Sequence, residues 1–146
     1  LMANAPRLLG WREWLALPDL GVPKIKAKID TGARTSCLHA FYVDPFRKAG
    51  DDWVRFGVHP VQHDDDAVLH CEARILDQRQ VTDSGGHREL RYVIQTRLRL
   101  LDYDDAIELT LTNRDSMRFR LLLGRTAMRK NIMIKPDKSY LLGRPA

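Results

Sequence analysis

The most informative segment of the chain is Ile25-Lys26-Ala27-Lys28-Ile29-Asp30-Thr31-Gly32-Ala33. Apolar and charged side chains alternate as far as Ile29, which is the period of a strand with one buried face. Asp-Thr-Gly directly follows the strand, so the Asp30 carboxylate lies at a strand end. Gly32 allows the backbone to turn tightly there, and the Thr31 hydroxyl can form a hydrogen bond beside the carboxylate. Taken alone, this short motif also fits an ordinary turn.

Alternation of the same kind recurs downstream. It runs through residues 91–100 and 107–112, which flank the polar turn 102–105. A second polar turn at 113–116 leads into the apolar segment 117–123. Three consecutive strands joined by short polar turns predict an antiparallel meander. Further strands are expected at residues 15–17, 53–58, 68–76, 132–134 and 140–142.

Two shorter features complete the pattern. Thr82-Asp83-Ser84-Gly85-Gly86-His87 is the most glycine-rich part of the chain and predicts a hairpin tip. Gly124 to Asn131 is the only good candidate for a short helix. No linker interrupts the pattern, so we expect a single all-β domain spanning residues 1–146 with one short C-terminal helix.

Composition narrows the class of protein. With 146 residues, 44% hydrophobic and 29% charged, the chain can bury a core, which argues against a disordered chain or a two-lobed enzyme. No apolar run approaches the roughly 18 residues of a membrane span, and Leu1 to Pro6 lacks the features of a signal peptide. We therefore expect a cytoplasmic protein. The net charge of +5 favours an acidic partner. The positive side chains are scattered along the sequence and form no basic block with interleaved aromatic residues, which argues against nucleic acid as that partner.

No motif for a metal or cofactor is found in the sequence. Cys37 and Cys71 form no Cys-x-x-Cys pair, so both are interpreted as reduced, small core residues. There is no His-Glu-x-x-His motif and no phosphate-binding Gly-x-x-x-x-Gly-Lys-Ser/Thr loop. We expect neither a metal site nor a cofactor.

The order of the motifs carries a resemblance. Asp-Thr-Gly-Ala at residues 30–33, then a glycine-bearing hairpin, then Leu121-Leu122-Leu123-Gly124-Arg125 and a short helix is similar to the order in retropepsin-like aspartic proteases. The resemblance implies the closed β-barrel of the acid protease fold. It also implies that Gly85 and Gly86 belong to a flap over the substrate cleft.

Longer segments resemble one bacterial family within that class. They are residues 10–14, 17–21, 25–36 and 38–40. The family is often labelled ATP-dependent zinc protease, and it includes the protease partner of an ATP-grasp ligase that adds glutamates to a ribosomal protein. The resemblance therefore implies a functional link to such a ligase and a glutamate-rich or polyglutamylated substrate.

The resemblance implies a dyad mechanism. One Asp-Thr-Gly supplies one carboxylate, whereas aspartic-protease chemistry needs two that share a proton and activate a water. The chain would therefore work as a homodimer, with Asp30 as the catalytic residue and Thr31 and Gly32 shaping its loop. Asp83-Ser84-Gly85 has a similar form, but a poorer strand precedes it, so the flap interpretation is preferred.

Three further residues are candidates for substrate binding. Ala33 cannot donate a side-chain hydrogen bond to the carboxylate, which predicts activity nearer neutral than gastric pH. Arg34 and Arg125 could each pair with a glutamate carboxylate, although Arg125 fits a bracing role equally well. Two alternatives stay open at this point: a non-catalytic peptide-binding or adaptor module on the same fold, and a zinc-dependent peptidase.

Overall fold

The computed structural model describes residues 5–62, 64–83, 85–101, 103–114 and 118–144. The structure is mostly β, and in the described ranges the helical segments are two short 3-10 helices, η2 (Pro18–Leu20) and η3 (Arg125–Met128). The strands are β1 (Arg7–Leu9), β2 (Arg12–Leu17), β3 (Val22–Ile29), β4 (Ser36–His39), β5 (Tyr42–Lys48), β6 (Asp51–Val58), β7 (Leu69–Arg74), β8 (Asp77–Thr82), β9 (Arg88–Leu100), β10 (Tyr103–Thr112), β11 (Leu121–Leu123) and β12 (Ile132–Ile134). Ser84, Asp102 and residues 115–117, which belong to expected turns and to the start of an expected strand, lie outside the described residues.

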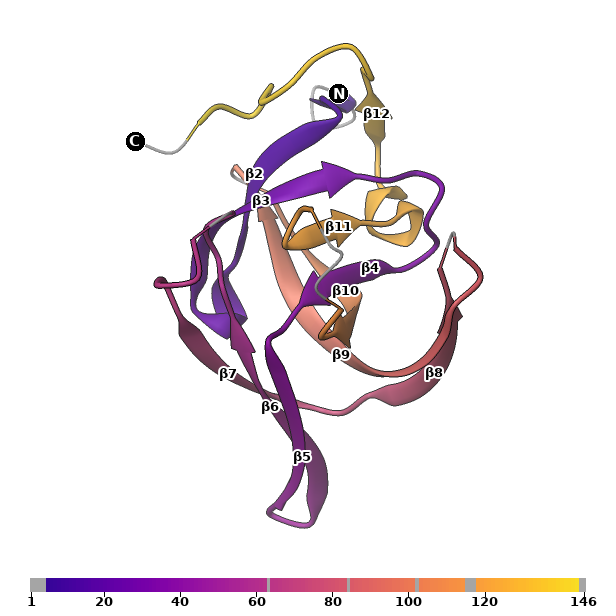
Figure 1. Ribbon diagram of the computed structural model, residues 1–146. Helices are drawn as coiled ribbons and strands as arrows, with labels where there is room; N and C mark the ends of the chain where they lie inside the picture. Colours follow the sequence, from indigo (N-terminus) through magenta and orange to yellow (C-terminus); the bar gives the residue numbers. More distant parts are fainter. Residues whose placement is uncertain (1–4, 63, 84, 102, 115–117, 145–146) are drawn as a thin grey trace.

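The strands form three sheets (Figure 1). The largest has the order β10-β4-β11-β3-β2-β9-β8, and β9 also pairs with β10. A second sheet, β5-β6-β7, includes a β5–β6 hairpin that projects from the body of the molecule. The third sheet is the parallel pair β1–β12, which lies at the opposite end of the molecule from that hairpin (Figure 1).

The alternation in the sequence explains how β3 and β9 are buried. On β3, Ile25, Ala27 and Ile29 are buried while the intervening lysines face outward. Along β9 the core side chains include Ile94, Leu98 and Leu100. Because one face of each strand is apolar, the sheets enclose a single apolar core between them.

Several predictions from the sequence are confirmed. Residues 25–29, 91–100 and 107–112 lie in strands β3, β9 and β10, and β9 pairs antiparallel with β10. Strands β8 and β9 form the expected hairpin, because Thr82 pairs with Arg88 next to its tip. Residues 132–134 form β12 as expected.

The expected meander is wrong in its third strand. The segment from Arg118 becomes a strand only at Leu121, and β11 pairs with β3 and β4 instead of β10. The edge of β10 is already occupied by β4, which runs parallel to it. Strand β4 was not expected, because all four of its residues are buried and give no alternation. Residues 140–142, expected as a strand, form a turn.

The expected helix at 124–131 is also shorter than predicted. Only Arg125–Met128 is helical, as one 3-10 turn, and Gly124 before it is extended. Asn131 adopts a positive φ of 60° and stops the turn just before β12.

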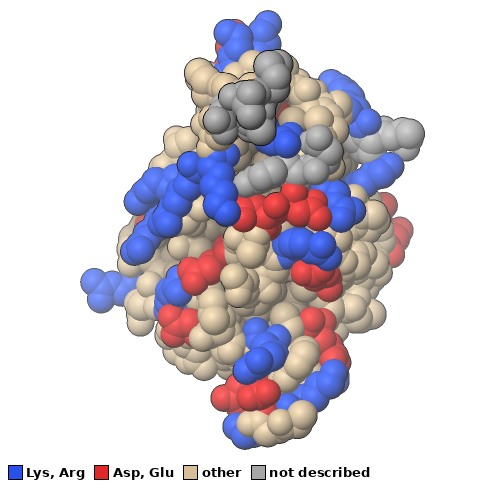
Figure 2. Space-filling model, turned by 180° about the vertical axis from the view of Figure 1, so that it is seen from behind, with Lys and Arg blue, Asp and Glu red and all other residues tan. Residues whose placement is uncertain are grey.

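Charge on the surface is mixed. Figure 2 shows Lys and Arg side chains interspersed with Asp and Glu over one whole face. Among the described residues, no helix is long and apolar enough to cross a membrane.

Candidate active site

Asp30 follows the last residue of β3 and is held from both sides. Its N–H donates to the carbonyl oxygen of Leu123 at 2.8 Å, and the preceding N–H of Ile29 donates to Trp11 at 2.8 Å. The carboxylate oxygen Oδ1 accepts the Gly32 N–H at 3.1 Å. The half-buried side chain is therefore fixed by the backbone, as a group that must meet a reacting atom needs to be.

The loop that carries Asp30 is interlocked with the segment after β11. The Arg125 N–H donates to the Ala33 carbonyl at 2.8 Å, and the Thr126 N–H donates to the Arg34 carbonyl at 3.0 Å. Gly124 fits between them with its N–H on Ser36 Oγ at 3.0 Å. A Cβ at Gly124 would lie 2.7 Å from the Thr35 carbonyl carbon, so only glycine permits this close approach.

Arg125 braces the same loop. Its guanidinium donates to the carbonyl oxygens of Thr31 at 3.5 Å and Gly32 at 3.3 Å. The side chain is exposed and is not part of the cavity wall described below. Of the two roles considered from the sequence, this geometry favours bracing of the loop over contact with substrate.

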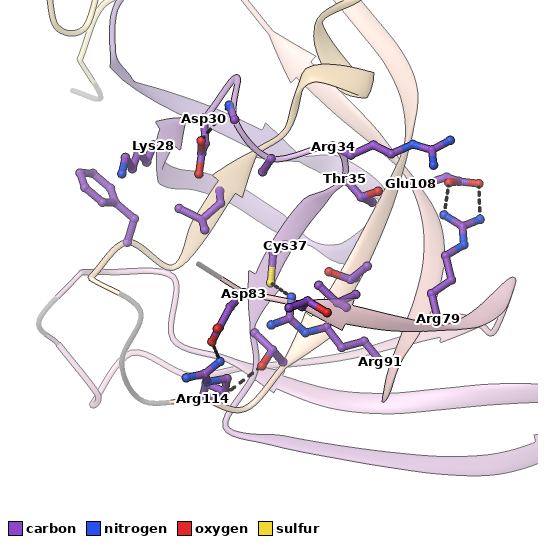
Figure 3. Close-up of a pocket in the computed structure, with 18 of the residues that line it drawn as sticks. Lys28, Asp30, Arg34, Thr35, Cys37, Arg79, Asp83, Arg91, Glu108 and Arg114 are labelled. Atoms are coloured by element: carbon purple, nitrogen blue, oxygen red, sulfur yellow. Dashed lines mark hydrogen bonds and ion pairs between the residues drawn. The ribbon is translucent and has the colours of Figure 1, made fainter. Parts of the chain in front are cut away.

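A cavity of about 1400 Å³ opens beside Asp30 (Figure 3). It is walled by the Asp30 loop, by β8 and β10, and by Phe119 and Leu122. Of the residues expected at the site, Asp30, Gly32, Ala33 and Arg34 line it. The cavity lining does not include Thr31, Arg125 or the two hairpin-tip glycines, Gly85 and Gly86.

Ion pairs tie the β8–β9 hairpin across this cavity. Arg79 on β8 donates to both oxygens of Glu108 on β10, at 2.7 and 3.2 Å. This guanidinium lowers the pKa of the Glu108 carboxyl, mainly through the hydrogen bond. Asp83, where the hairpin turns, pairs with Arg114 beyond β10 (Figure 3). The hairpin therefore lies over the cavity with charged contacts on two sides.

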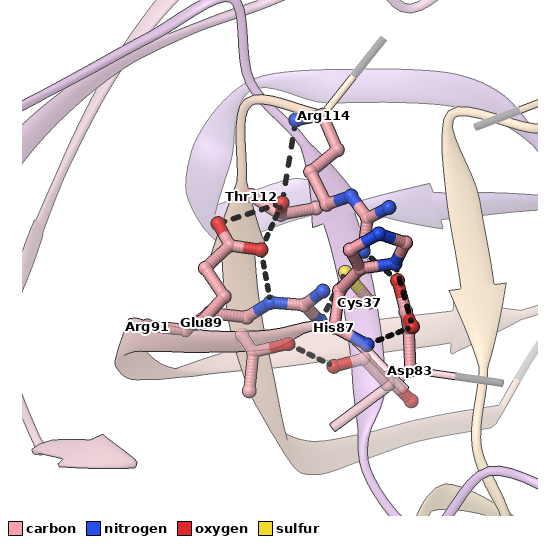
Figure 4. Close-up of polar contacts among 9 residues, drawn as sticks. Cys37, Asp83, His87, Glu89, Arg91, Thr112 and Arg114 are labelled. Carbon is pink, nitrogen blue, oxygen red and sulfur yellow. Dashed lines mark hydrogen bonds and ion pairs between the residues drawn. The ribbon is translucent and has the colours of Figure 1, made fainter. Parts of the chain in front are cut away.

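A buried polar network forms one wall of the cavity (Figure 4). Arg91 is only 8% exposed and donates to Glu89 at 3.1 Å and to the Cys37 Sγ at 3.3 Å. The Thr112 hydroxyl donates to the same Glu89 carboxylate. Burial raises the pKa of the Cys37 thiol. A thiol kept protonated in this way is a poor nucleophile, which argues against cysteine chemistry in the cavity.

Metal ligands do not gather at this site. Within the described ranges, which leave out His63, no group of three or more His, Cys, Asp or Glu side chains could hold a metal ion.

Sequence reasoning missed several residues of the cavity wall. Lys28 could have been found, because residues two apart on a strand share a face and Asp30 lies two positions later. Arg79, Arg91, Glu108 and Arg114 had no comparable signal. Their meeting depends on the pairing of β8, β9 and β10, which brings distant parts of the chain together.

A solved structure has a similar fold. The crystal structure of Lpg0085, a protein of unknown function (DUF785) from Legionella pneumophila, superposes with a TM-score of 0.78 and 26% identity, covering 93% of this chain and 98% of that one.

Related sequences are longer proteins. A probable alpha-L-glutamate ligase of Shewanella halifaxensis is 45% identical over 142 residues, which is 97% of this chain and 31% of the relative. One from Parasynechococcus marenigrum is 47% identical over 136 residues, 93% of this chain and 29% of the relative. The chain thus spans about three tenths of the length of these relatives.

The family model described as "RimB-like: Retropepsin-like aspartic endopeptidase RimB" matches residues 8–145. With its Asp-Thr-Gly loop in place beside a large cavity, the chain belongs to the RimB-like family of retropepsin-like aspartic endopeptidases.

Proposed function

We propose that this chain is an aspartic endopeptidase that acts as a homodimer on glutamate-rich or polyglutamylated peptides. One observation carries the proposal: the Asp30 carboxylate follows a buried strand, is fixed by Leu123 and Gly32, and opens onto a cavity of about 1400 Å³.

The catalytic unit is proposed to be a dimer. Among the described residues, the Asp30 loop supplies one carboxylate to the cavity, and a water-activating dyad needs two. The parallel pair β1–β12 offers a place for a second copy, since Leu8 is 44% and Met133 56% exposed and the two are directly paired. A twofold axis through the Asp30 loops would bring the two carboxylates together.

The chemistry follows from that arrangement. Two close carboxylates share one proton, because both cannot carry a charge at such a distance. The ionised Asp30 would take a proton from a water that attacks the peptide carbonyl, and the protonated one would donate to the departing amine. Gly32 and Arg125 would keep the loops rigid, and Gly85 and Gly86 would form the flap over the bound peptide.

The proposed substrate is acidic. Six cationic residues line the cavity (Lys28, Arg34, Arg79, Arg91, Arg114 and Arg118), against three acidic ones (Asp30, Asp83 and Glu108). This excess favours a peptide with several carboxylates. Relatives that contain a segment similar to this chain are named as probable alpha-L-glutamate ligases. We therefore propose a functional link to such a ligase, in the cytoplasm.

The fold proposed for this function is one retropepsin-like domain covering residues 1–146, with a closed barrel. The pairing of β9 with β10 supports closure, because it joins the first strand of the order β10-β4-β11-β3-β2-β9 to the last. A closed sheet would leave few edges and would hold the Asp30 loop stiffly.

The test is cleavage of a peptide with a C-terminal oligoglutamate tail, followed by mass spectrometry in the presence of a chelator. We expect the wild type to cleave the peptide and Asp30→Asn to lose at least about 1000-fold in rate, because the dyad loses its ionisable partner. Asp44→Asn, at an exposed position of β5, is the matched control and should retain full activity.

The alternatives give different outcomes. If neither protein cleaves while both are folded and dimeric, the peptide-binding or adaptor module becomes the better interpretation. Activity that the chelator abolishes, together with stoichiometric zinc in the protein, would favour the zinc peptidase.

A further inference from the structure

Lys28 is the cation closest in sequence to Asp30 on the same face of β3. The core side of the strand is formed by Ala27 and Ile29, so Lys28 faces outward like Asp30, and both line the cavity. Figure 3 shows them together, away from the Arg79–Glu108 pair. A substrate bond that reaches Asp30 therefore lies in a cavity that Lys28 also lines.

The charge of Lys28 is not neutralised by the protein. In the part of the chain that the structure describes, its ammonium group has no hydrogen bond or ion pair. Two of the acidic residues that line the cavity form ion pairs with other residues: Glu108 pairs with Arg79, and Asp83 pairs with Arg114. Asp30 is the remaining acidic residue of the cavity lining, and in the described part of the chain no ion pair joins it to Lys28, so the ammonium group is available to an acidic substrate.

The neighbouring strands do not supply a second such cation. Arg12 on β2 is directly opposite Lys28, but its guanidinium stacks on Trp11 and Tyr140 at 4.6 and 4.9 Å and donates to Ser139. On the other side, Lys28 pairs with the apolar Leu122 of β11.

Apolar side chains line the same cavity as Lys28. Trp11 and Phe119 line the same cavity and pack edge to face, with ring centroids 5.9 Å apart. Apolar walls can cover the two methylene groups of a glutamate while an ammonium pairs with its carboxylate.

We propose that Lys28 is a specificity-determining residue, whose ammonium group pairs with the carboxylate of the substrate side chain next to the cleaved bond. This inference rests on the proposed function and assigns its acidic preference to one residue. Lys28 binds the carboxylate of the substrate side chain, while Asp30 acts on the peptide bond of the substrate backbone.

Binding is tested first, without cleavage. Asp30→Asn protein is titrated into a fluorescently labelled peptide with an oligoglutamate tail, and into one with an oligoglutamine tail, by anisotropy at low salt. We expect added Lys28→Ala to weaken glutamate-tail binding about tenfold and to leave glutamine-tail binding nearly unchanged. Lys28→Arg should retain most of the affinity.

Lys26→Ala is the matched control, because it removes one lysine from the same face of β3. Its ammonium lies over the Trp14 and Tyr140 rings, at 5.3 and 5.9 Å, outside the cavity lining. It should change glutamate-tail affinity less than about twofold. An equal loss in Lys26→Ala and Lys28→Ala, no loss in Lys28→Ala, or no binding of the glutamate tail by Asp30→Asn protein would each overturn the proposal.

Cleavage by enzyme that retains Asp30 gives the second readout. Lys28→Ala should lower kcat/KM for the glutamate tail about tenfold relative to the glutamine tail. Equal losses on both tails would refute a role in specificity. If the wild type cleaves neither peptide, the proposed peptidase function fails, while the binding titration still decides the role of Lys28.

Discussion

The N–H of Asp30 donates to the carbonyl oxygen of Leu123 at 2.8 Å, so the proposed catalytic residue is positioned by a strand far from it in sequence. Strand β11 runs parallel to β3, with Leu123 paired to Ile29. Immediately afterwards the chain passes the Asp30 loop at Gly124. The position of the carboxylate therefore depends on how closely these two segments can approach.

Gly124→Ala should separate the two segments. The new Cβ would lie within 2.9 Å of the Arg34 oxygen and the Ser36 nitrogen, which are backbone atoms and cannot move aside cheaply. We expect the free energy of unfolding to fall by about 2–3 kcal/mol, measured by urea denaturation. Peptidase activity should fall more than stability alone explains, since Asp30 is displaced.

Gly85→Ala is the control for this substitution. The nearest atoms to its Cβ belong to the side chains of His87 and Asp83, at 3.2 Å or more. It should change the free energy of unfolding by less than about 0.5 kcal/mol. Similar losses in both variants would show that the close approach at Gly124 has no special cost.

A second buried carboxylate holds the C-terminal segment. Glu13 is fully buried and accepts the N–H groups of Gly10 at 2.7 Å, Leu141 at 2.9 Å and Leu142 at 3.1 Å. Glu13→Gln keeps the size but places an amide NH₂ against at least one of these donors. We expect a loss of about 2–3 kcal/mol in the free energy of unfolding, with faster hydrogen exchange at Leu141 and Leu142.

Glu72→Gln provides the comparison for Glu13. Glu72 lies on the exposed face of β7 and pairs with Arg55 at 3.0 Å. Removing this surface pair should cost less than about 1 kcal/mol and leave exchange at the C-terminal amides unchanged. Equal effects of the two substitutions would contradict the anchoring role of Glu13.

The sequence allowed prediction of features that depend on local period. Alternation located β3, β9 and β10, and Asp30 is the catalytic candidate because it directly follows such a strand. The fully buried β4 gave no period, and the parallel pairings of β11 with β3 and of β4 with β10 leave no local trace. Those pairings decide where the cavity residues Arg79, Glu108 and Arg114 meet, so most of the cavity wall could not be predicted.

The thiol of Cys71 makes stability depend on alkaline pH. Its residue is 4% exposed and its Sγ donates to the Leu20 carbonyl at 3.3 Å. Burial raises the pKa of this thiol from 9.0 to about 11. Because the folded-state pKa lies above the unfolded one, the protonated thiol stabilises the fold fully below pH 9, and this contribution is lost as the pH rises to about 11.

We therefore expect the stability difference between the wild type and Cys71→Ala to shrink between these pH values. Two pH units correspond to at most about 3 kcal/mol. The measurement is urea unfolding of both proteins under reducing conditions at several pH values. The comparison with Cys71→Ala cancels the titration of lysines and tyrosines that the proteins share. A difference that stays constant across this range would contradict the prediction.

The proposed dimer makes a prediction about the β1–β12 pair. Met133 is 56% exposed and lies directly opposite Leu8, so a charge there would be placed in the surface that a second copy is proposed to cover. Met133→Glu should weaken association at least about 100-fold, because an unpaired carboxylate would be buried in the interface. Analytical ultracentrifugation should then find a dimer for the wild type and a monomer for the variant.

Leu101→Glu is the control, since Leu101 is 62% exposed in the turn between β9 and β10 and its substitution should leave the dimer intact. Peptidase activity should fall with the dimer fraction in Met133→Glu and recover at high protein concentration, because each copy supplies one carboxylate of the dyad. Full activity in a strictly monomeric variant would refute the shared dyad and would require the second catalytic group to come from the same chain.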